Sequence, residues 1–298
     1  MMMPVFRCNI CGAGNRSAVK LSEREGGLCS SCGSNIRLRS VVLALSRALF
    51  NCELPLTDFP SLKTVRGLGF SDSEIYARPL ERLFSYSNTY FHREPRFDIA
   101  QSDPARLGLF DFVICSEVLE HVAPPVERAF ATLRALLKPS GVLILTVPYG
   151  LDDETIERFD GIADPRLVTL DGKPLVIGRD PEGSFIVRDD IVFHGGPGAT
   201  LEMRIFSESA LRSHLENAGF PNVAFDAEES PEFGVAYPGP CSLPIIVGNW
   251  AGNGGVLFSP ANTGELLEEF VRVQRKLLAA RESRWLRLGR LLGLGPKV

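Results

Sequence analysis

Apolar and polar positions along the chain form blocks that predict strands followed by helices. Residues 112–115 are a wholly apolar run, typical of a strand covered on both faces of a parallel sheet. Residues 62–69 predict a further strand, again with a helical pattern after it. Residues 36–50 repeat apolar side chains at helical spacing, and Ser34 or Asn35 stands where a cap is expected. Alternation of strands and helices predicts an α/β fold with a mostly parallel sheet.

The stretch DFVICSEVLEHV, residues 111–122, joins the apolar strand to a loop dense in polar and ionisable groups. Ser116, Glu117, Glu120 and His121 follow directly after the strand. Ligands of open α/β sheets bind outside the carboxyl ends of the strands. We therefore expect the functional site at this loop.

Two further segments have recognisable patterns. Residues 173–190 alternate around a glycine-containing turn and predict a β-hairpin within a long insertion, residues 150–200. Residues 263–292 predict an amphipathic helix with acidic residues first and basic residues last. Such a helix can lie on an anionic membrane surface or pair with another helix, although docking on its own domain is the plainer interpretation.

Composition narrows the class of protein. The chain has 298 residues, of which 45% are hydrophobic, enough for one large α/β domain with a small addition. It contains no apolar run near the roughly 20 residues that span a bilayer, and no secretory signal pattern. A cytoplasmic protein, with peripheral contact at the inner membrane as a variant, is expected. The seven cysteines are then reduced thiols or metal ligands.

The charge is unevenly distributed. The net charge of −4 combines about +5 in residues 1–50 and +4 in residues 264–298, which leaves −13 for the middle. An acidic central part repels phosphate backbones, so a nucleic-acid partner is unlikely except through the ends.

The first part of the chain contains two C-x-x-C pairs at metal-ligand spacing. Cys8, Cys11, Cys29 and Cys32 supply four thiolates, which complete a tetrahedral zinc shell without an open position. The segment resembles a zinc ribbon and predicts a structural Zn²⁺ site. The basic residues around it can contact phosphate, but a scatter of this kind more often forms a solvated surface.

Residues 62–69 end in the sequence Gly67-Leu68-Gly69, which is followed by residues suited to start a helix. Glycines at a strand-to-helix turn allow a ligand to approach the backbone. Taken alone, a G-x-G sequence is better explained by a structural turn.

Residues 111–121 resemble the fourth-strand motif of class I S-adenosylmethionine (SAM)-dependent methyltransferases, closely that of the ubiquinone-type O-methyltransferases. The Lys-Pro-x-Gly turn at residues 138–141 and the Ala-Gly-Phe sequence ending at Phe220 also match, and the resemblance covers roughly residues 60–250. It implies a Rossmann-like seven-stranded, mostly parallel sheet with helices on both faces. The expected organisation is a zinc ribbon (1–35), a connecting helix and linker (36–60), a methyltransferase domain (61–250) whose insertion caps the substrate, and a C-terminal amphipathic helix (251–298).

The resemblance also implies which residues bind SAM. Asp98 matches the acid that meets the adenine amino group, Gly67 and Gly69 match the first motif, and Ser116 and Glu117 face the cofactor. The family's usual acid before the first glycine and its third glycine are replaced by Val65 and Ser71. The second-strand acid that holds the ribose is also absent, and Asn88, His92 or Glu94 would substitute for it.

Three interpretations of the loop after the strand remain open. Glu117, Glu120 and His121 lie on one side of a helical turn and, with His194 from the insertion, can hold a divalent metal such as Mg²⁺, as in related O-methyltransferases. Without metal, His121 or His194 can act as general base, because histidine has an ordinary pKa near neutrality. The third interpretation is architectural, and the two non-metal interpretations are favoured over the metal.

These observations predict a SAM-dependent methyltransferase that acts on a hydroxyl of a sugar, glycolipid or other small molecule, with Glu120, His121 and His194 as catalytic residues. Two alternatives are an RNA methyltransferase anchored by the zinc ribbon and a non-catalytic methyltransferase-like binding protein, the latter suggested by the thin first motif.

Overall fold

The computed structural model describes residues 5–16, 23–101, 103–194, 200–237, 239 and 243–248. The predicted C-terminal helix, residues 251–298, lies outside these ranges. The described helices are α1 (Ile36–Phe50), α2 (Glu74–Leu83), α3 (Glu127–Leu136) and α4 (Glu208–Asn217), with the 3-10 turns η1 (Leu56–Asp58), η2 (Pro104–Arg106), η3 (Leu119–His121) and η4 (Pro231–Phe233).

The described strands fall into one large sheet and several small ones. The large sheet contains β3 (Leu62–Phe70), β4 (Phe84–Thr89), β5 (Phe110–Ser116), β6 (Leu137–Thr146), β15 (Val223–Phe225) and β16 (Ile245–Gly248). The small sheets contain β1 (Val5–Arg7), β2 (Gly14–Arg16), β7 (Tyr149–Gly150), β8 (Ile156–Glu157), β9 (Ala163–Leu170), β10 (Lys173–Arg179), β11 (Phe185–Arg188), β12 (Phe193–His194), β13 (Thr200–Leu201) and β14 (Arg204–Ser207).

The large sheet has the strand order β15-β16-β6-β5-β3-β4. Its neighbours pair in parallel from β6 to β4, whereas β16 runs antiparallel to both β6 and β15. The predicted Rossmann-like α/β fold is confirmed. Within the described residues, however, this sheet has six strands rather than seven, because the segment after β4 forms only an isolated bridge between Tyr90 and Arg96.

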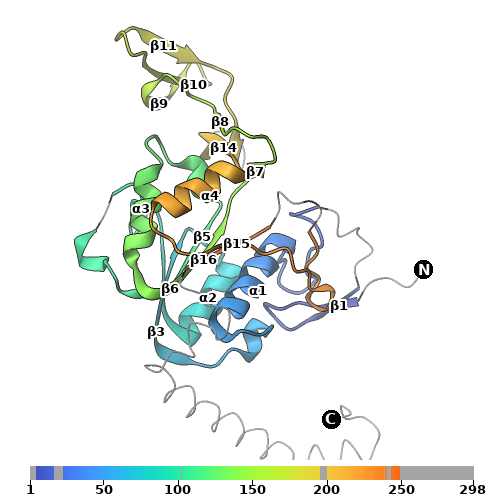
Figure 1. Ribbon diagram of the computed structural model, residues 1–298. Coiled ribbons are helices and arrows are strands. Elements are labelled where there is room, and N and C mark those ends of the chain that lie inside the picture. The colour runs from blue at the N-terminus through green and yellow to red at the C-terminus, as the bar shows by residue number, and fades with distance from the viewer. Residues whose placement is uncertain are drawn as a thin grey trace, which may run out of the picture.

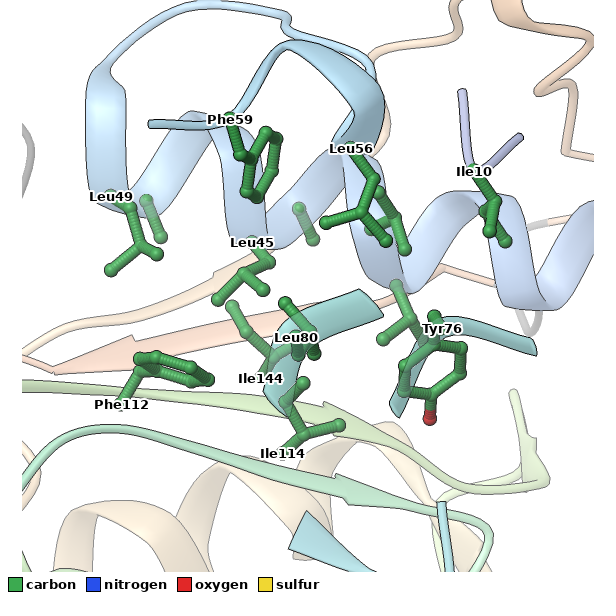
Figure 2. Packing of buried hydrophobic residues seen from close by; sticks show 14 of the residues in the cluster. Ile10, Leu45, Leu49, Leu56, Phe59, Tyr76, Leu80, Phe112, Ile114 and Ile144 are labelled. Carbon is green, nitrogen blue, oxygen red and sulfur yellow. The ribbon is translucent and has the colours of Figure 1, made fainter. Parts of the chain in front are cut away.

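Helices cover both faces of the large sheet, α1 and α2 on one and α3 and α4 on the other (Figure 1). Strand β5 is buried along its whole length, as its apolar pattern predicted. Phe112 and Ile114 point into the core beneath α1 (Figure 2), and Val113 and Cys115 point into the core beneath α3. The carboxyl end of β5 is thereby held from both sides.

Local sequence signals fix the helix starts. The Asn35 side chain accepts the Leu38 N–H at 2.8 Å and begins α1, and Ser207 caps α4 in the same manner. The segment 204–220, which ends in the Ala-Gly-Phe sequence, contains α4 but is not helical throughout. Its first four residues form β14, where Ile205 pairs with the small strand β8 instead of coiling.

The insertion forms an arm that extends from the large sheet (Figure 1). The predicted hairpin is present as β10 and β11, and β9 adds a third antiparallel strand. One face of the arm packs Val176 against a small core with Phe159, Ile162 and Met203. The opposite face leaves Phe185 72% exposed.

The cysteine-rich segment, of which residues 5–16 and 23–35 are described, is not a separate lobe. Its apolar residues share one core with α1 and the large sheet. Phe6 and Ile10 are buried in the cluster that contains Phe112. Arg39 is fully buried and donates hydrogen bonds to the carbonyls of Ser34 and Gly234. The expectation of a solvated basic surface is therefore wrong for this arginine.

The turn η4 begins a loop that follows β15. Phe233 packs against Leu43 of α1, with Tyr237 beside them, so the described part of this loop contributes to the core. In the part of the chain that the structure describes, none of the helices combines the length and the apolar character that crossing a bilayer requires.

Candidate functional site

The candidate site lies where β5 ends and the polar stretch begins. Ser116 is the last residue of β5 and Glu117 follows with a positive φ of 57°, which turns the chain sharply. The Glu117 N–H donates to the carbonyl of Thr146, at the end of the neighbouring strand β6. Because positive φ is unfavourable for a residue with a side chain, this backbone shape is maintained by its surroundings.

Two arginines from the N-terminal segment contact this turn. The Arg24 guanidinium forms an ion pair with the Glu117 carboxylate, which also accepts the Thr146 hydroxyl at 2.9 Å. Arg37, in the first turn of α1, donates to Ser116 Oγ at 3.3 Å. The predicted cofactor residues Ser116 and Glu117 therefore already have cationic partners within the chain.

Glu120 has an unusual environment for a carboxylate. Its side chain is fully buried, and neither carboxylate oxygen has a hydrogen-bond partner among the described residues. Burial, reinforced by the nearby negative charge of Glu117, raises the pKa of Glu120 well above its usual range. A buried carboxyl without donors is destabilising unless it is protonated or neutralised by a cation.

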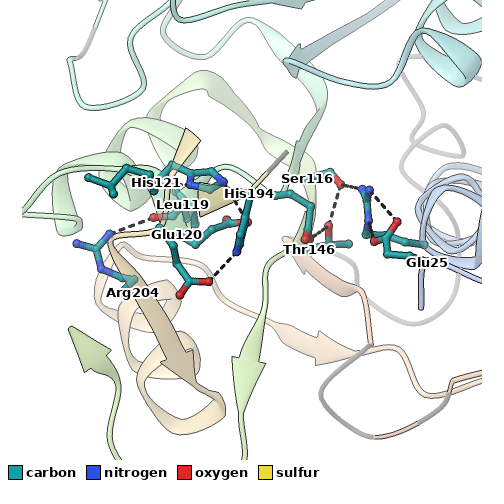
Figure 3. Close-up of polar contacts among 12 residues, drawn as sticks. Glu25, Ser116, Leu119, Glu120, His121, Thr146, His194 and Arg204 are labelled. Atoms are coloured by element: carbon teal, nitrogen blue, oxygen red, sulfur yellow. Dashed lines mark hydrogen bonds and ion pairs between the residues drawn. The ribbon is translucent and has the colours of Figure 1, made fainter. Parts of the chain in front are cut away.

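Two histidines lie beside Glu120, although the second comes from the insertion (Figure 3). His121 Nε2 lies 3.7 Å and His194 Nδ1 lies 3.9 Å from Glu120 Oε1. The two rings are nearly perpendicular, with centroids 5.0 Å apart. One ligand atom from each of the three side chains falls within 4.8 Å of the others, which is a spacing that a single metal ion can bridge.

The far nitrogen of each histidine is engaged, which fixes the tautomer. His121 Nδ1 lies 2.8 Å from the Leu201 carbonyl, an acceptor, so this nitrogen carries the proton and Nε2 is free. His194 Nε2 lies 2.7 Å from Glu202 Oε2, and Arg158 holds the other oxygen of Glu202. Both free ring nitrogens therefore face Glu120.

Burial lowers the pKa of His121, so the neutral ring persists to lower pH than usual. The neutral form is the one that accepts a proton or binds a metal. His194 is more open, with 34% of its side chain exposed. The cluster thus has a closed side at Glu120 and an accessible side at His194.

The structure brings together three of the four residues predicted for the metal. Glu117 is not one of them, because the turn from 119 to 121 is a 3-10 turn that begins after it and its positive φ directs it elsewhere. Its carboxylate contacts Arg24 and Thr146 instead. The four-ligand version of the predicted site is therefore wrong in this one residue.

Gly67 and Gly69 lie inside β3 rather than in an open turn. A Cβ at Gly67 would overlap the ring of Phe112, and one at Gly69 would overlap the Tyr86 hydroxyl and the Asp72 carboxylate. Close packing of core side chains therefore requires glycine at both positions. Their role in SAM binding stays a prediction.

Asn88 was predicted to hold the ribose. It is buried instead, and its amide accepts the Asp72 N–H at 3.0 Å and donates to the Asp72 carbonyl at 2.9 Å. The Asp72 carboxylate is also buried and accepts hydrogen bonds from Tyr76 and Tyr86. Burial raises the pKa of Asp72 to about 7, although these hydroxyl donors oppose the shift.

Asp98 was predicted to meet the adenine. Its carboxylate accepts the Ala100 N–H at 3.0 Å and the Gln101 side-chain amide at 2.8 Å, and thus stabilises its own turn. Asp98 remains only partly buried, and its contact with the adenine of SAM stays a prediction.

The four predicted cysteines come together. Cys8 Sγ lies 3.7 Å from Cys32 Sγ, and Cys11 Sγ lies 3.6 Å from Cys29 Sγ. Four thiolates bound to one zinc at the usual bond length would be separated by about 3.8 Å, so the cluster is compatible with a tetrahedral site. Polar groups approach the sulfurs from outside, including the Ser34 hydroxyl at 3.2 Å from Cys8.

Sequence reasoning missed Glu202, Arg24, Arg37 and Asp72. Glu202 had a detectable signal, since a charged residue stands between the apolar Leu201 and Met203. The arginines had none, because 93 residues separate Arg24 from its partner and 79 separate Arg37 from its own.

Comparison with solved structures returned many matches with low identity. Among them, the 1,6-didemethyltoxoflavin-N1-methyltransferase of Burkholderia thailandensis is 18% identical over 62% of this chain and 71% of that chain, with a TM-score of 0.34. DesVI of Streptomyces venezuelae is 15% identical over 71% and 91%, with a TM-score of 0.40. The amino pentose methyltransferase CalS10 of Micromonospora echinaspora is 16% identical over 72% and 92%, with a TM-score of 0.38.

A search of curated protein sequences returned no significant match. The family comparison is more informative, because one family described as "Methyltransferase domain" matches residues 60–224. This range covers more than half of the chain and includes β3 to β6, the loop after β5, and the whole of the insertion and of α4. With its Rossmann-like sheet, the chain therefore belongs to the methyltransferase domain family and is a class I SAM-dependent methyltransferase.

Proposed function

We propose that the protein transfers the methyl group of SAM to a hydroxyl of a sugar or other small molecule. The observation that carries this proposal is the buried Glu120 carboxyl, which has no donor among the described residues and faces two free histidine nitrogens. A hydroxyl keeps its proton at neutral pH, so its methylation requires a group that removes the proton. The Glu120–His121–His194 cluster supplies such groups.

His194 is the residue best placed to accept this proton. It is accessible, and its Nδ1 is free because Nε2–H donates to Glu202. The Glu202 carboxylate, held by Arg158, would stabilise the positive charge that His194 acquires. The remaining demand is alignment, since the SAM sulfonium is already a good leaving group and the protein mainly positions the acceptor oxygen opposite it.

The same three side chains fit a divalent metal. Glu120 lacks partners, and each histidine directs a bare nitrogen inward while its other N–H is held by an outer acceptor, as is usual for metal-bound histidine. Two imidazoles suit Zn²⁺, Mn²⁺ or Fe²⁺ better than the Mg²⁺ suggested by resemblance. A bound metal would lower the pKa of the acceptor hydroxyl.

The cysteine cluster has a different role in this proposal. Four thiolates leave no position for a substrate, so we infer a structural Zn²⁺ held by Cys8, Cys11, Cys29 and Cys32. The segment then stabilises the fold around the site rather than reacting.

The insertion contributes to the acceptor site in this proposal. His194 lies on β12, and β12 pairs with β13 at the base of the arm. The acceptor would therefore bind between the end of β5 and the insertion.

A methyltransferase-like protein without catalysis is the second candidate, and it is suggested by the first motif, where Val65 and Ser71 replace the usual acid and the third glycine. Calorimetry of the full chain with SAM separates the two candidates. Enzyme function requires SAM binding, and an absence of binding at about 1 mM SAM would overturn it.

The reaction itself is tested with labelled SAM and matched sets of hydroxyl and amine acceptors. We expect label only in the products of hydroxyl acceptors. In His194→Ala the rate of labelling should fall by at least about 100-fold, and the affinity for SAM should be unchanged. Unchanged turnover in His194→Ala, or label on amines only, would contradict O-methylation at this cluster.

A further inference from the structure

The cysteine-rich segment reaches the end of β5 through Arg24. This residue lies between the two cysteine pairs, and its guanidinium contacts the Glu117 carboxylate at the turn after β5. Both side chains are about one-fifth exposed. The contact therefore lies at the border between the protein interior and the space in front of the sheet.

The fold of the segment fixes the position of Arg24. The Arg24 carbonyl accepts the Arg37 N–H at 3.0 Å, and the Gly26 carbonyl accepts the Ile36 N–H at 3.2 Å. Residues 24–26 therefore lie along the start of α1. The Glu25 side chain holds the Arg37 guanidinium from the other side. A few residues later, Cys29 enters the cysteine cluster. Loss of the cluster would release Arg24.

Arg24 has binding capacity that the protein does not use. A guanidinium offers five N–H donors in a planar fork that matches a carboxylate with two hydrogen bonds. The Arg24 Nε is buried and has no partner among the described residues. Beside it, Glu117 presents a carboxylate and Ser116 a hydroxyl.

Opposite charges side by side are complementary to an amino-acid head group. An α-carboxylate pairs with a guanidinium fork, and an α-ammonium pairs with a carboxylate. SAM carries such a head group at its methionine end. Arg24 and Glu117 can each exchange part of their mutual contact for a ligand group of the opposite charge, without leaving either charge unpaired.

We propose that Arg24 binds the α-carboxylate of SAM while Glu117 receives its α-ammonium group, so that the cysteine-rich segment forms one wall of the cofactor site. This inference rests on the proposed function, because it requires that SAM binds at the end of β5. It assigns a binding residue to a segment outside the range 60–224 that the methyltransferase family covers.

The test uses two ligands of which only SAM carries the amino-acid part. 5′-Methylthioadenosine keeps the adenosine and the sulfur of SAM but lacks the carboxylate, the ammonium group and the positive charge on sulfur, and this difference is the same for every variant compared. Calorimetry of the full chain would compare Arg24→Gln with the wild type and with Arg7→Gln, a control in the same segment whose arginine is half exposed beside Asp58. We expect Arg24→Gln to weaken the binding of SAM by about 10- to 100-fold and the binding of 5′-methylthioadenosine by less than about twofold. Arg7→Gln should change neither.

An equal loss for both ligands in Arg24→Gln would overturn the inference, because Arg24 would then only join the segment to the sheet. No loss for either ligand would overturn it as well. If Arg24→Gln does not fold, Arg24→Lys retains the charge without the fork, and a SAM-selective loss is still required. Wild-type protein that binds neither ligand would refute the proposed function itself, whereas tight SAM binding with an indifferent Arg24 refutes only this inference.

Discussion

Among the residues that the structure describes, two clusters of metal-ligand side chains differ in their chemistry. The cysteine cluster consists of four identical ligands from two short loops, of which Cys8 and Cys29 are buried and Cys11 and Cys32 are partly buried. The second cluster combines a buried carboxyl with two histidines, one of which comes from the insertion and is partly exposed. A closed set of ligands favours a structural role, and a mixed set with an open side favours chemistry.

The largest effect should follow from removing the closed cluster. Cys8→Ser/Cys11→Ser eliminates two of four thiolates, and because such metal binding is coupled to folding, we expect the midpoint of thermal unfolding to fall by more than about 10 °C. Elemental analysis should show one zinc fewer per chain. Cys52→Ser, which changes an exposed cysteine outside the cluster, is the matched control.

The structural role of the cysteine cluster would be contradicted if the double variant kept both its zinc content and its unfolding temperature. The cysteines would then be four thiols that share a core without a metal, and the segment would depend on its apolar packing alone.

A smaller and different effect is expected at the open cluster. Glu120→Gln removes the only carboxylate there that lacks a donor, so catalytic rate should fall by about 100-fold or more while the fold remains intact. Mn²⁺ or Zn²⁺ should raise the unfolding temperature of the wild type but not of the variant. Glu154→Gln, at an exposed acid of the insertion, provides the control.

The open cluster would be architectural if Glu120→Gln retained full activity. Loss of activity with no metal effect in either protein would instead favour His194 acting as a base without metal.

The buried carboxyl of Asp72 differs from that of Glu120, and the effect of replacing it should be the smallest. Asp72 is buried like Glu120, but two tyrosine hydroxyls donate to it. Its pKa of about 7 in the folded protein lies above the ordinary 3.8, so its stabilising contribution is complete below pH 4 and is lost as the pH rises through 7. The slope is about 1.4 kcal/mol per pH unit for one proton.

Asp72→Asn retains the shape but cannot ionise. We expect its free energy of unfolding, measured by urea titration from pH 4 to pH 8, to rise relative to that of the wild type by roughly a few kcal/mol across this range. Parallel pH profiles for the two proteins would show that Asp72 stays charged in the folded state. Burial alone would then be insufficient to raise the pKa of a carboxyl, at Glu120 as at Asp72.

The sequence predicted what depends on neighbouring residues. The two C-x-x-C pairs, the helix 36–50 and the apolar strand before Ser116 each follow from local spacing, and each is present. The turn at Glu117 was misjudged because a helical spacing of i, i+3, i+4 says nothing about a positive φ at its first residue.

Contacts between distant segments were beyond the sequence for a physical reason. Arg24 reaches Glu117 only after the cysteine-rich segment has folded against α1, and Asn88 contacts Asp72 only when β3 and β4 pair. No periodicity encodes such distances. The absence of a seventh strand among the described residues has a local cause instead, since residues 91–96 are all exposed and mostly polar rather than a buried apolar run.

The placement of His194 on β12 has a consequence for how this enzyme can diversify. In the proposed function, the insertion that would select an acceptor also supplies His194, one of the three groups of the Glu120–His121–His194 cluster. Exchanging the whole insertion for that of a relative would alter specificity and remove part of the reaction machinery in one step. A workable chimera must therefore retain the paired strands β12 and β13 and exchange only the distal arm, residues 163–188, whose strands β9, β10 and β11 pair with one another.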